Sequence, residues 1–163
     1  MTHAPAFVRY SNPLTRGLLR LGVPMGPNLL LTVRGRTTGI LRTAPVAVVE
    51  TEGRRLIIAA YGEVHWVRNL RAAGEADIEI RGRKEHVKAV ELSRTKAIHF
   101  YAETLPAYIN RFPLFGRAFA RVLFGLVGPE VLNDPARAAE MHPVFELTAL
   151  PMPHEGRSTA DSD

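Results

Sequence analysis

The sequence LLLTVRGRTTGILRTAPVAVVETEGRRLIIAAYGEVHWVRN, residues 29–69, decides the fold of this chain. Three apolar runs in it, each rich in leucine and β-branched residues, are short enough for strands: 29–33, 46–49 and 56–60. Glycines between these runs, in 35–39 and in the pair Glu52-Gly53, are typical of tight turns. The stretch therefore predicts a three-stranded meander.

The apolar runs do not alternate cleanly between apolar and polar side chains. A strand with one wet face would show that alternation, so both faces of these strands should be covered, as in a small barrel. The remaining strands are recognised by the same signals and are expected at 76–80, 84–92 and 144–150. In the second of these the apolar residues change face, which predicts a β-bulge near Ala89-Val90.

A helix is predicted directly after the third strand, because Val64 and the apolar residues that follow recur at helical spacing up to Gly74. Trp66 and Asn69 are three residues apart, and His65 and Asn69 are four apart, so all three share one side of this helix. We therefore expect a helix face that carries the polar groups of these three side chains, next to the end of a strand.

Further helices are indicated along the chain. Ser93 should cap one that ends near Pro106, a very apolar one should span 114–126, and Asp134-Pro135 should open a short one. The apolar helix fits a core position or dimer interface as well as a substrate pocket or lipid contact. At the N-terminus, 13–21 predicts a short helix with leucines on one side and arginines on another.

These elements predict an α+β, mainly β, fold: a split β-barrel of about six mostly antiparallel strands with flanking helices. Residues 1–150 should form one domain, with the helix at 13–21 and a helical insertion at 93–141. Residues 151–163 are expected to be a disordered tail.

Composition narrows the function classes. The chain has 21 basic and 16 acidic residues, and 151–163 holds three acids and one arginine, so the remainder has 20 basic and 13 acidic residues, or +7. The arginines are scattered without a recognition helix or an aromatic RNA-binding signature, so the expected anionic partner is a small molecule and not nucleic acid. No cysteine is present, and the six histidines contain no i, i+4 pair, so no metal site is expected.

The expected location is the cytoplasm, because no signal peptide and no membrane-length apolar run is found. The basic leucine helix at 13–21 is expected either to pack on the barrel as a lid or to make peripheral contact with the inner face of an anionic membrane.

Three motifs together resemble the deazaflavin-dependent nitroreductase family of actinobacteria: Gly35-Arg36-Thr37-Thr38-Gly39, Arg42-Thr43-Ala44-Pro45, and Trp66-Val67-Arg68-Asn69-Leu70-Arg71-Ala72. The resemblance covers 29–92 and 142–147 most closely. It implies a fold similar to the FMN-binding split barrels and coenzyme F420, a deazaflavin, as hydride donor. Because such a cofactor carries the chemistry, the protein needs only to bind, orient and exclude water, and no catalytic residue is assigned.

The site residues follow from this resemblance and from side-chain chemistry. The phosphodiester and polyglutamate tail of the cofactor calls for arginines, hydroxyls and backbone N–H groups, which the loop from Arg36 to Thr43 offers, with Arg42 as first choice. The expected cofactor-binding residues are Arg36, Thr37, Thr38, Arg42, Thr43, Pro45, Ala59, Ala60, Tyr61, Gly62, Trp66 and Asn69. For Trp66 the alternative is a core anchor. The expected substrate-pocket residues are Tyr61, His65, Tyr101 and Tyr108.

The sequence thus predicts an F420-dependent reductase that transfers a hydride to a small-molecule acceptor, either a quinone, a nitro compound or an activated enone. It should act as a monomer or a homodimer. The alternatives are an FMN-dependent split-barrel oxidoreductase and a non-catalytic protein that holds a deazaflavin, lipid or haem in the same groove.

Overall fold

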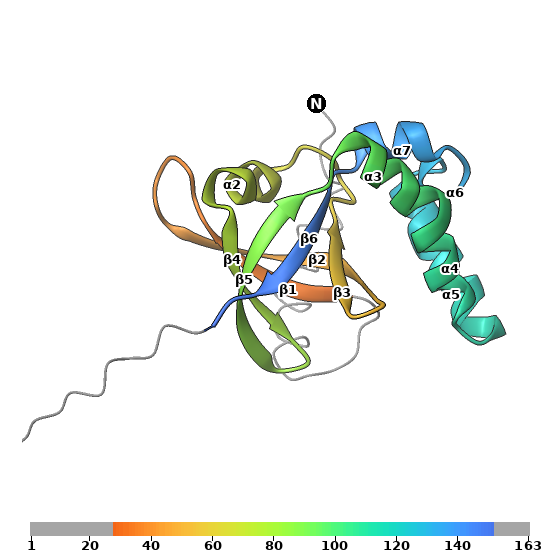
Figure 1. Ribbon diagram of the computed structural model, residues 1–163, viewed down its shortest axis with the longest axis horizontal. Helices are drawn as coiled ribbons and strands as arrows, with labels where there is room; N and C mark the ends of the chain where they lie inside the picture. Colours follow the sequence, from red (N-terminus) through yellow and green to blue (C-terminus); the bar gives the residue numbers. More distant parts are fainter. Residues whose placement is uncertain (1–27, 152–163) are drawn as a thin grey trace, which may run out of the picture.

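The structure is a computed structural model that describes residues 28–151, apart from the side chains of Asn28, Phe119, Leu123, Leu126 and Val127. The predicted helix at 13–21 and nearly all of the predicted tail lie outside the described residues. The body of the molecule is a β-barrel; one helix lies against it beside the first hairpin, and the remaining helices are grouped on another side (Figure 1).

Six antiparallel strands close the barrel in the order β1-β2-β3-β6-β5-β4. They are β1 (Asn28–Arg34), β2 (Leu41–Thr51), β3 (Arg54–Ile58), β4 (Glu75–Ile80), β5 (Arg83–Glu91) and β6 (Val144–Ala149). Closure leaves no unpaired edge strand among them. The predicted six-stranded split-barrel fold is confirmed.

Tight turns fix the register of two hairpins. Glu52 and Gly53 both have positive φ, 52° and 72°, as do Arg81 and Gly82, at 50° and 75°. Two consecutive residues of positive φ are typical of the type I′ turn, whose twist matches that of paired strands. The predicted Glu52-Gly53 hairpin is confirmed.

The first hairpin corrects a predicted boundary. β2 begins at Leu41, so Arg42 and Thr43 are strand residues opposite Val33 and Thr32 and not part of a loop. The backbone N–H and C=O groups at the end of β1 need hydrogen-bond partners. The backbone of Arg42 and Thr43 can supply them whether or not the side chains are apolar. The apolar run at 46–49 marks only the buried part of this strand.

The barrel interior is filled by alternate residues of every strand and by one helix. Leu31, Val46, Ile57 and Phe145 belong to this interior cluster, and each is at most 4% exposed. The helix α2 (His65–Ala73) adds Val67 and Leu70, both 0% exposed, and ends at Gly74 with a left-handed φ of 69°. The predicted helix over this range is confirmed.

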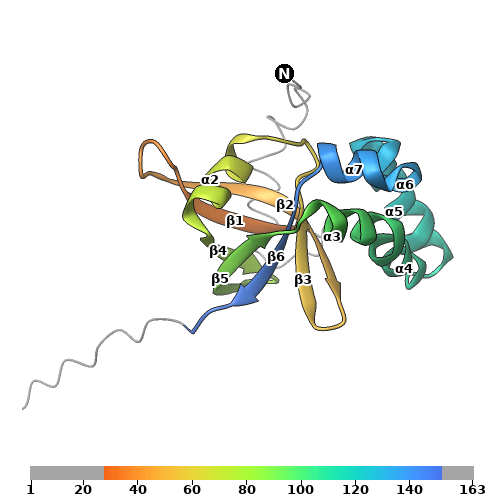
Figure 2. The same ribbon diagram turned by 45° about the horizontal axis from the view of Figure 1, so that its top comes forward.

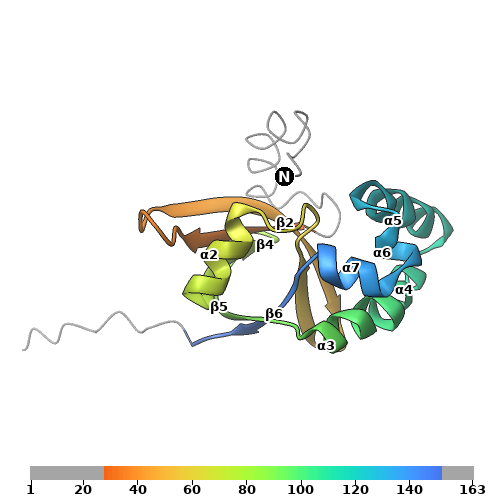
Figure 3. The ribbon, with the colours of Figure 1, turned by 90° about the horizontal axis from the view of Figure 1, so that it is seen from above.

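Other helices cover the outside of β3 and its neighbours (Figures 2 and 3). They are α3 (Arg94–His99), the π-helix η1 (Phe100–Thr104), α4 (Leu105–Asn110), α5 (Leu114–Val127), α6 (Glu130–Asn133) and α7 (Pro135–Met141). The helices and the strands form a second hydrophobic cluster, here called the outer cluster, to which the strands contribute Val49, Leu56, Ile58 and Val144, while Ile57 points inward. Both faces of β2 and β3 are therefore covered, as the missing alternation predicted.

Two predicted details are wrong. The helix after Ser93 does not end at Pro106, because the chain changes to the wider π-helix just before the proline, which has no N–H to donate, and continues as α4. No bulge occurs at Ala89-Val90, because pairing with β6 runs without interruption from Val87 to Glu91. The strand simply leaves the apolar Val90 side chain 52% exposed on the outside.

Candidate functional site

A cavity of about 600 Å³ lies between the β1–β2 hairpin and the N-terminal part of α2. Its lining comes from two segments that are far apart in sequence and side by side in the structure (Figure 1). The lining residues are Gly35, Arg36, Thr37, Thr38, Arg42, Ala44, Val64, His65, Trp66 and Asn69.

The hairpin side of the cavity is a tight, hydrogen-bonded loop. The Gly35 N–H donates to the Ile40 carbonyl at 2.9 Å, and the Gly39 N–H donates to the Gly35 carbonyl at 2.8 Å. A Cβ at Gly35 would lie 3.0 Å from the Ile40 carbonyl oxygen and from Thr38 Oγ1, and Gly39 has a φ of 68°. The two glycines therefore allow Arg36, Thr37 and Thr38 to be held over the cavity.

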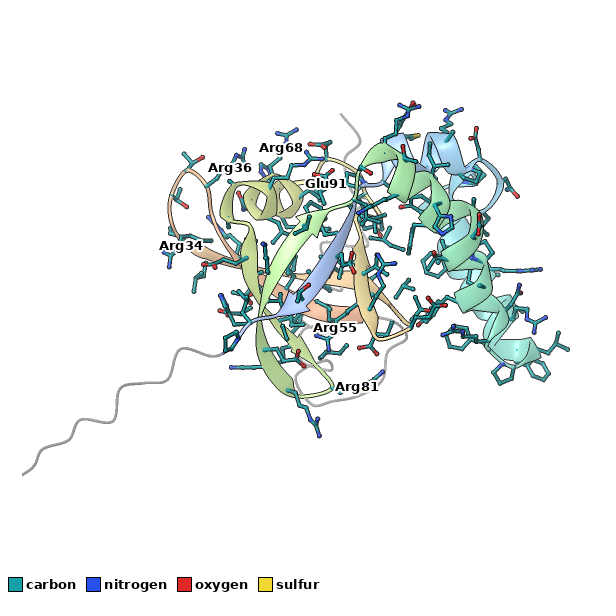
Figure 4. All side chains as sticks on the ribbon, in the orientation of Figure 1. Arg34, Arg36, Arg55, Arg68, Arg81 and Glu91 are labelled. Atoms are coloured by element: carbon teal, nitrogen blue, oxygen red, sulfur yellow. The ribbon has the colours of Figure 1, made fainter. Side chains whose placement is uncertain are left out.

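Asn69 joins the hairpin to α2. It is 6% exposed, and its Oδ1 accepts two hydrogen bonds from Arg36, at 3.2 Å from the backbone N and 3.0 Å from Nη1. Figure 4 shows Arg36 where the hairpin meets the helix. Arg36 and Asn69 thus fix the mouth of the cavity together, a role the sequence did not assign.

Trp66 forms a half-buried wall of the cavity. Its ring centroid lies 6.0 Å from that of Phe145, and it packs on the interior cluster. It therefore both anchors α2 and lines the cavity, which combines the two interpretations considered for it.

The described lining of the cavity carries only positive charge. Arg36 and Arg42 contribute guanidinium groups, and no aspartate or glutamate is among the lining residues. Val64 is the N-cap of α2 and makes no side-chain cap hydrogen bond, and the first turn of the helix holds no acid. A helix N-terminus carries partial positive charge, so the lining favours an anionic ligand.

The nearby acid Glu63 points its charge to other arginines. Its carboxylate pairs with Arg71 and lies 3.8 Å from Arg68 Nε. Arg71 also donates to both oxygens of Glu91, which ties α2 to β5, and these hydrogen bonds raise the pKa of the Arg71 guanidinium. Arg71 therefore holds the helix in place and neutralises the acids beside it.

Of the predicted site residues, the structure brings seven to this cavity: Arg36, Thr37, Thr38, Arg42, His65, Trp66 and Asn69. Thr43 and Pro45 are not among them. Side chains alternate along a strand, and Arg42 and Ala44 take the cavity side, so Thr43 and Pro45 face the opposite side. Thr43 instead contacts Thr32 across the pair, with the two Oγ1 atoms 2.8 Å apart.

The predicted segment 59–62 leads into α2 without lining the cavity. Ala59 is fully buried, and its N–H donates to the Pro143 carbonyl at 2.9 Å. A Cβ at Gly62 would lie 2.9 Å from the Met141 carbonyl oxygen, and Gly62 has a φ of 67°. Ala60 and the 43% exposed Tyr61 complete the turn. These residues place the N-terminus of α2.

Tyr101 and Tyr108, expected at the substrate pocket, lie outside the lining of this cavity. Tyr101 is 1% exposed, its hydroxyl donates to the His142 carbonyl at 2.8 Å, and burial raises the pKa of its phenol. Tyr108 packs edge-on against Phe112 beside the outer cluster. Both tyrosines therefore contribute to the packing of the helices on the barrel.

Sequence reasoning missed Gly35, Ala44 and Val64 as lining residues. Ala44 was detectable, since it lies two residues after Arg42 in an extended strand and so shares its side. Val64 follows from its place just before the helix, where backbone N–H groups are exposed. Gly35 was expected as a turn residue and as part of a family motif, but not as a lining residue.

Within 28–151, no group of three or more His, Cys, Asp or Glu side chains is arranged to hold a metal ion. In the same part of the chain, no helix is long and apolar enough to cross a membrane.

Comparison with known proteins adds a family. The model of the family described as F420H(2)-dependent quinone reductase matches residues 10–112, more than half of the chain. No protein of curated function matches.

Solved structures to which the chain is similar include one described as a domain-swapped dimer, at 20% identity and a TM-score of 0.50, covering 87% of this chain and 97% of that one. An F420-H2 dependent reductase, FDR-A, has 20% identity and a TM-score of 0.47, covering 75% and 94%. HutZ, a heme storage protein from Vibrio cholerae, has 14% identity and a TM-score of 0.45, covering 85% and 89%.

Proposed function

Because the chain belongs to the F420H(2)-dependent quinone reductase family and is an oxidoreductase, we propose that it reduces a quinone with F420H2 held in the cavity between the β1–β2 hairpin and α2. The observation that carries the proposal is the composition of this cavity. Guanidinium groups and a helix N-terminus meet a half-buried tryptophan there, without an acid in the described lining.

These residues fit a deazaflavin with a long anionic tail. Arg42 is exposed at the cavity and would hold a phosphate or carboxylate of the tail, with the Thr37 and Thr38 hydroxyls as further donors. The Arg36 guanidinium has five donors, of which only Nη1 is used on Asn69 in the hydrogen bonds above, so it can support the tail as well. The N-terminus of α2 would add attraction for an anion.

Trp66 offers an apolar surface for the ring system of the cofactor, since it is half-buried and fixed by its contact with Phe145. Bound F420H2 would supply the hydride. The role left to the chain is to orient the ring, keep water from it and leave room for the acceptor. Among the predicted acceptor contacts, His65 remains a candidate at the rim of the cavity.

Quinone is the acceptor class proposed first, after the family description. Nitro compounds and activated enones share with quinones an electron-poor centre that accepts a hydride, and they are the next candidates. A survey of all three classes at fixed F420H2 would rank them.

The proposal is tested by fluorescence titration of F420 into wild type, Arg42→Ala and the control Arg83→Ala, an exposed arginine on β5 outside the cavity lining. Loss of a charge-assisted hydrogen bond costs about 1.5–3 kcal/mol, so Arg42→Ala should weaken binding roughly ten- to a hundredfold. The rate at saturating cofactor should change less, because tail contacts are common to ground and transition states.

FMN, titrated in parallel, decides between cofactors. FMN has one phosphate and no polyglutamate tail, so it should bind more weakly and depend less on salt. Tight FMN binding together with undetectable F420 binding would overturn the cofactor assignment. Unchanged F420 affinity in Arg42→Ala would overturn only the role of that arginine.

A further inference from the structure

One side of α5 is an exposed apolar surface. Leu114 is 73% exposed, Phe115 is 88% exposed and Val122 is 63% exposed, and they lie along one stripe of the helix with Ala118 and Gly125, which are also exposed. Figure 3 shows α5 at the outer edge of the molecule. We call these five residues and Arg121 the α5 face.

The opposite side of α5 accounts for its packing on the protein. Ala120 and Phe124 are 8% and 3% exposed and belong to the outer cluster, and the helix packs on α4 and α6. The α5 face is therefore not needed for the core. Soluble proteins rarely expose large apolar side chains in one contiguous patch unless the patch binds a partner or a membrane.

The segment that carries the α5 face contains charge of only one sign. From Asn110 to Gly128 the chain contains three arginines and no acid. Arg117 donates to the Asn110 carbonyl at 3.1 Å, while Arg111 and Arg121 are exposed. Arg121, which lies on the α5 face itself, therefore offers a guanidinium group to a partner beside the apolar side chains.

We propose that the α5 face docks peripherally on an anionic lipid surface. Apolar side chains can enter the boundary between headgroups and acyl chains, while the arginines contact lipid phosphates. The helix has 14 residues and is about 21 Å long, short of the roughly 30 Å of a bilayer core, so it lies on the surface.

A second copy of the chain is the less suitable occupant. A two-fold interface presents the same patch from both subunits. Two α5 faces would bring arginines together with no acid in the segment to pair them. Charge complementarity therefore favours anionic lipid over self-association.

The test is flotation of the full-length protein with vesicles of phosphatidylcholine alone or mixed with phosphatidylglycerol. Wild type should float only with the anionic vesicles, and high salt should weaken binding. Phe115→Ser should reduce the vesicle partition constant roughly tenfold, because serine has no apolar ring to transfer from water into the lipid. Arg121→Gln should reduce it about fivefold.

Val90→Ser and Lys88→Gln are the matched controls, since they remove an exposed apolar group and an exposed charge from β5. Both should bind vesicles like wild type. Circular dichroism melting of all variants checks that the substitutions leave the fold intact. The readout needs no cofactor, so its result is independent of the proposed function.

Three outcomes would overturn the proposal. The first is absence of wild-type flotation with anionic vesicles. The second is unchanged flotation of Phe115→Ser and Arg121→Gln, which would move the membrane contact elsewhere, for example to the basic helix predicted at 13–21. The third is a wild-type dimer in sedimentation that Phe115→Ser converts to monomer without an effect on vesicles, which would make a second copy the occupant.

Discussion

Substitutions at Asn69 can separate an effect on the stability of the fold from an effect on ligand affinity. Its Oδ1 accepts both the backbone N–H and Nη1 of Arg36. Asn69→Ala removes both hydrogen bonds, each worth about 0.5–1.5 kcal/mol. The free energy of unfolding should therefore fall by about 1–3 kcal/mol. The hairpin loop should also lose its fixed position over the cavity.

Asn69→Asp keeps the shape and the acceptor oxygen but adds a negative charge. Because that charge faces the Arg36 guanidinium, the free energy of unfolding should stay within about 1 kcal/mol of wild type. The same charge opposes an anionic cofactor in the cavity. For two charges about 8 Å apart and an effective dielectric constant of about 20, the repulsion is about 2 kcal/mol, or roughly a thirtyfold loss of affinity.

The assay pairs thermal melting with F420 fluorescence titration at low and high salt for wild type and both variants. Asn69→Asp is expected to melt like wild type and to bind F420 weakly, with the defect shrinking at high salt. Wild-type affinity in Asn69→Asp would refute the anion-binding character of the cavity. A parallel loss of stability and binding in Asn69→Asp would mean that Asn69 acts only as a structural anchor.

Two further variants test the outer layer. Tyr101→Phe leaves the buried His142 carbonyl without its donor, so urea denaturation should show a loss of about 1–3 kcal/mol while F420 affinity is unchanged. The second is Glu130→Gln. The His142 imidazole, whose Nε2 lies 3.0 Å from Glu130 Oε1, holds the pKa of this carboxyl below its usual value. A depressed carboxyl pKa stabilises the fold above the unfolded pKa and loses that effect as pH falls through the folded pKa, so wild type should melt above Glu130→Gln at pH 7 and the difference should shrink below about pH 4.5.

Local signals were enough to predict most of the fold. The Glu52-Gly53 turn, the Asp134 cap with Pro135 behind it and the end of α2 at Gly74 each depend on the backbone chemistry of a few neighbouring residues. Such signals survive packing because no distant contact competes with them. The start of β2 was missed since a polar strand end is decided by its partner β1, which lies elsewhere in sequence.

The sequence predicted those parts of the site that depend on the helical spacing of neighbouring residues. Trp66 and Asn69 were expected on one side of α2, and the structure puts both at the cavity. The hydrogen bonds between Asn69 and Arg36 span 33 residues and leave no periodic trace in the sequence. For Tyr101 the sequence left core and pocket equally open, because a tyrosine on a helical stripe looks the same in both; the structure shows its hydroxyl donating to the buried His142 carbonyl.

The two hydrophobic clusters explain why the cavity between the β1–β2 hairpin and α2 and the α5 face can be tested separately. The cavity depends on α2, whose Trp66 packs on the interior cluster, whereas α5 packs through Phe124 on the outer cluster. β2 and β3 contribute to both clusters, so a substitution inside these strands, such as one at Ile57 or Ile58, affects the whole domain and cannot separate the two surfaces. Arg42 and Phe115 are exposed and belong to neither cluster, so their loss acts on one surface at a time. A defect that stays confined to F420 in Arg42→Ala, or to vesicles in Phe115→Ser, can therefore be assigned to contact with the ligand and not to folding.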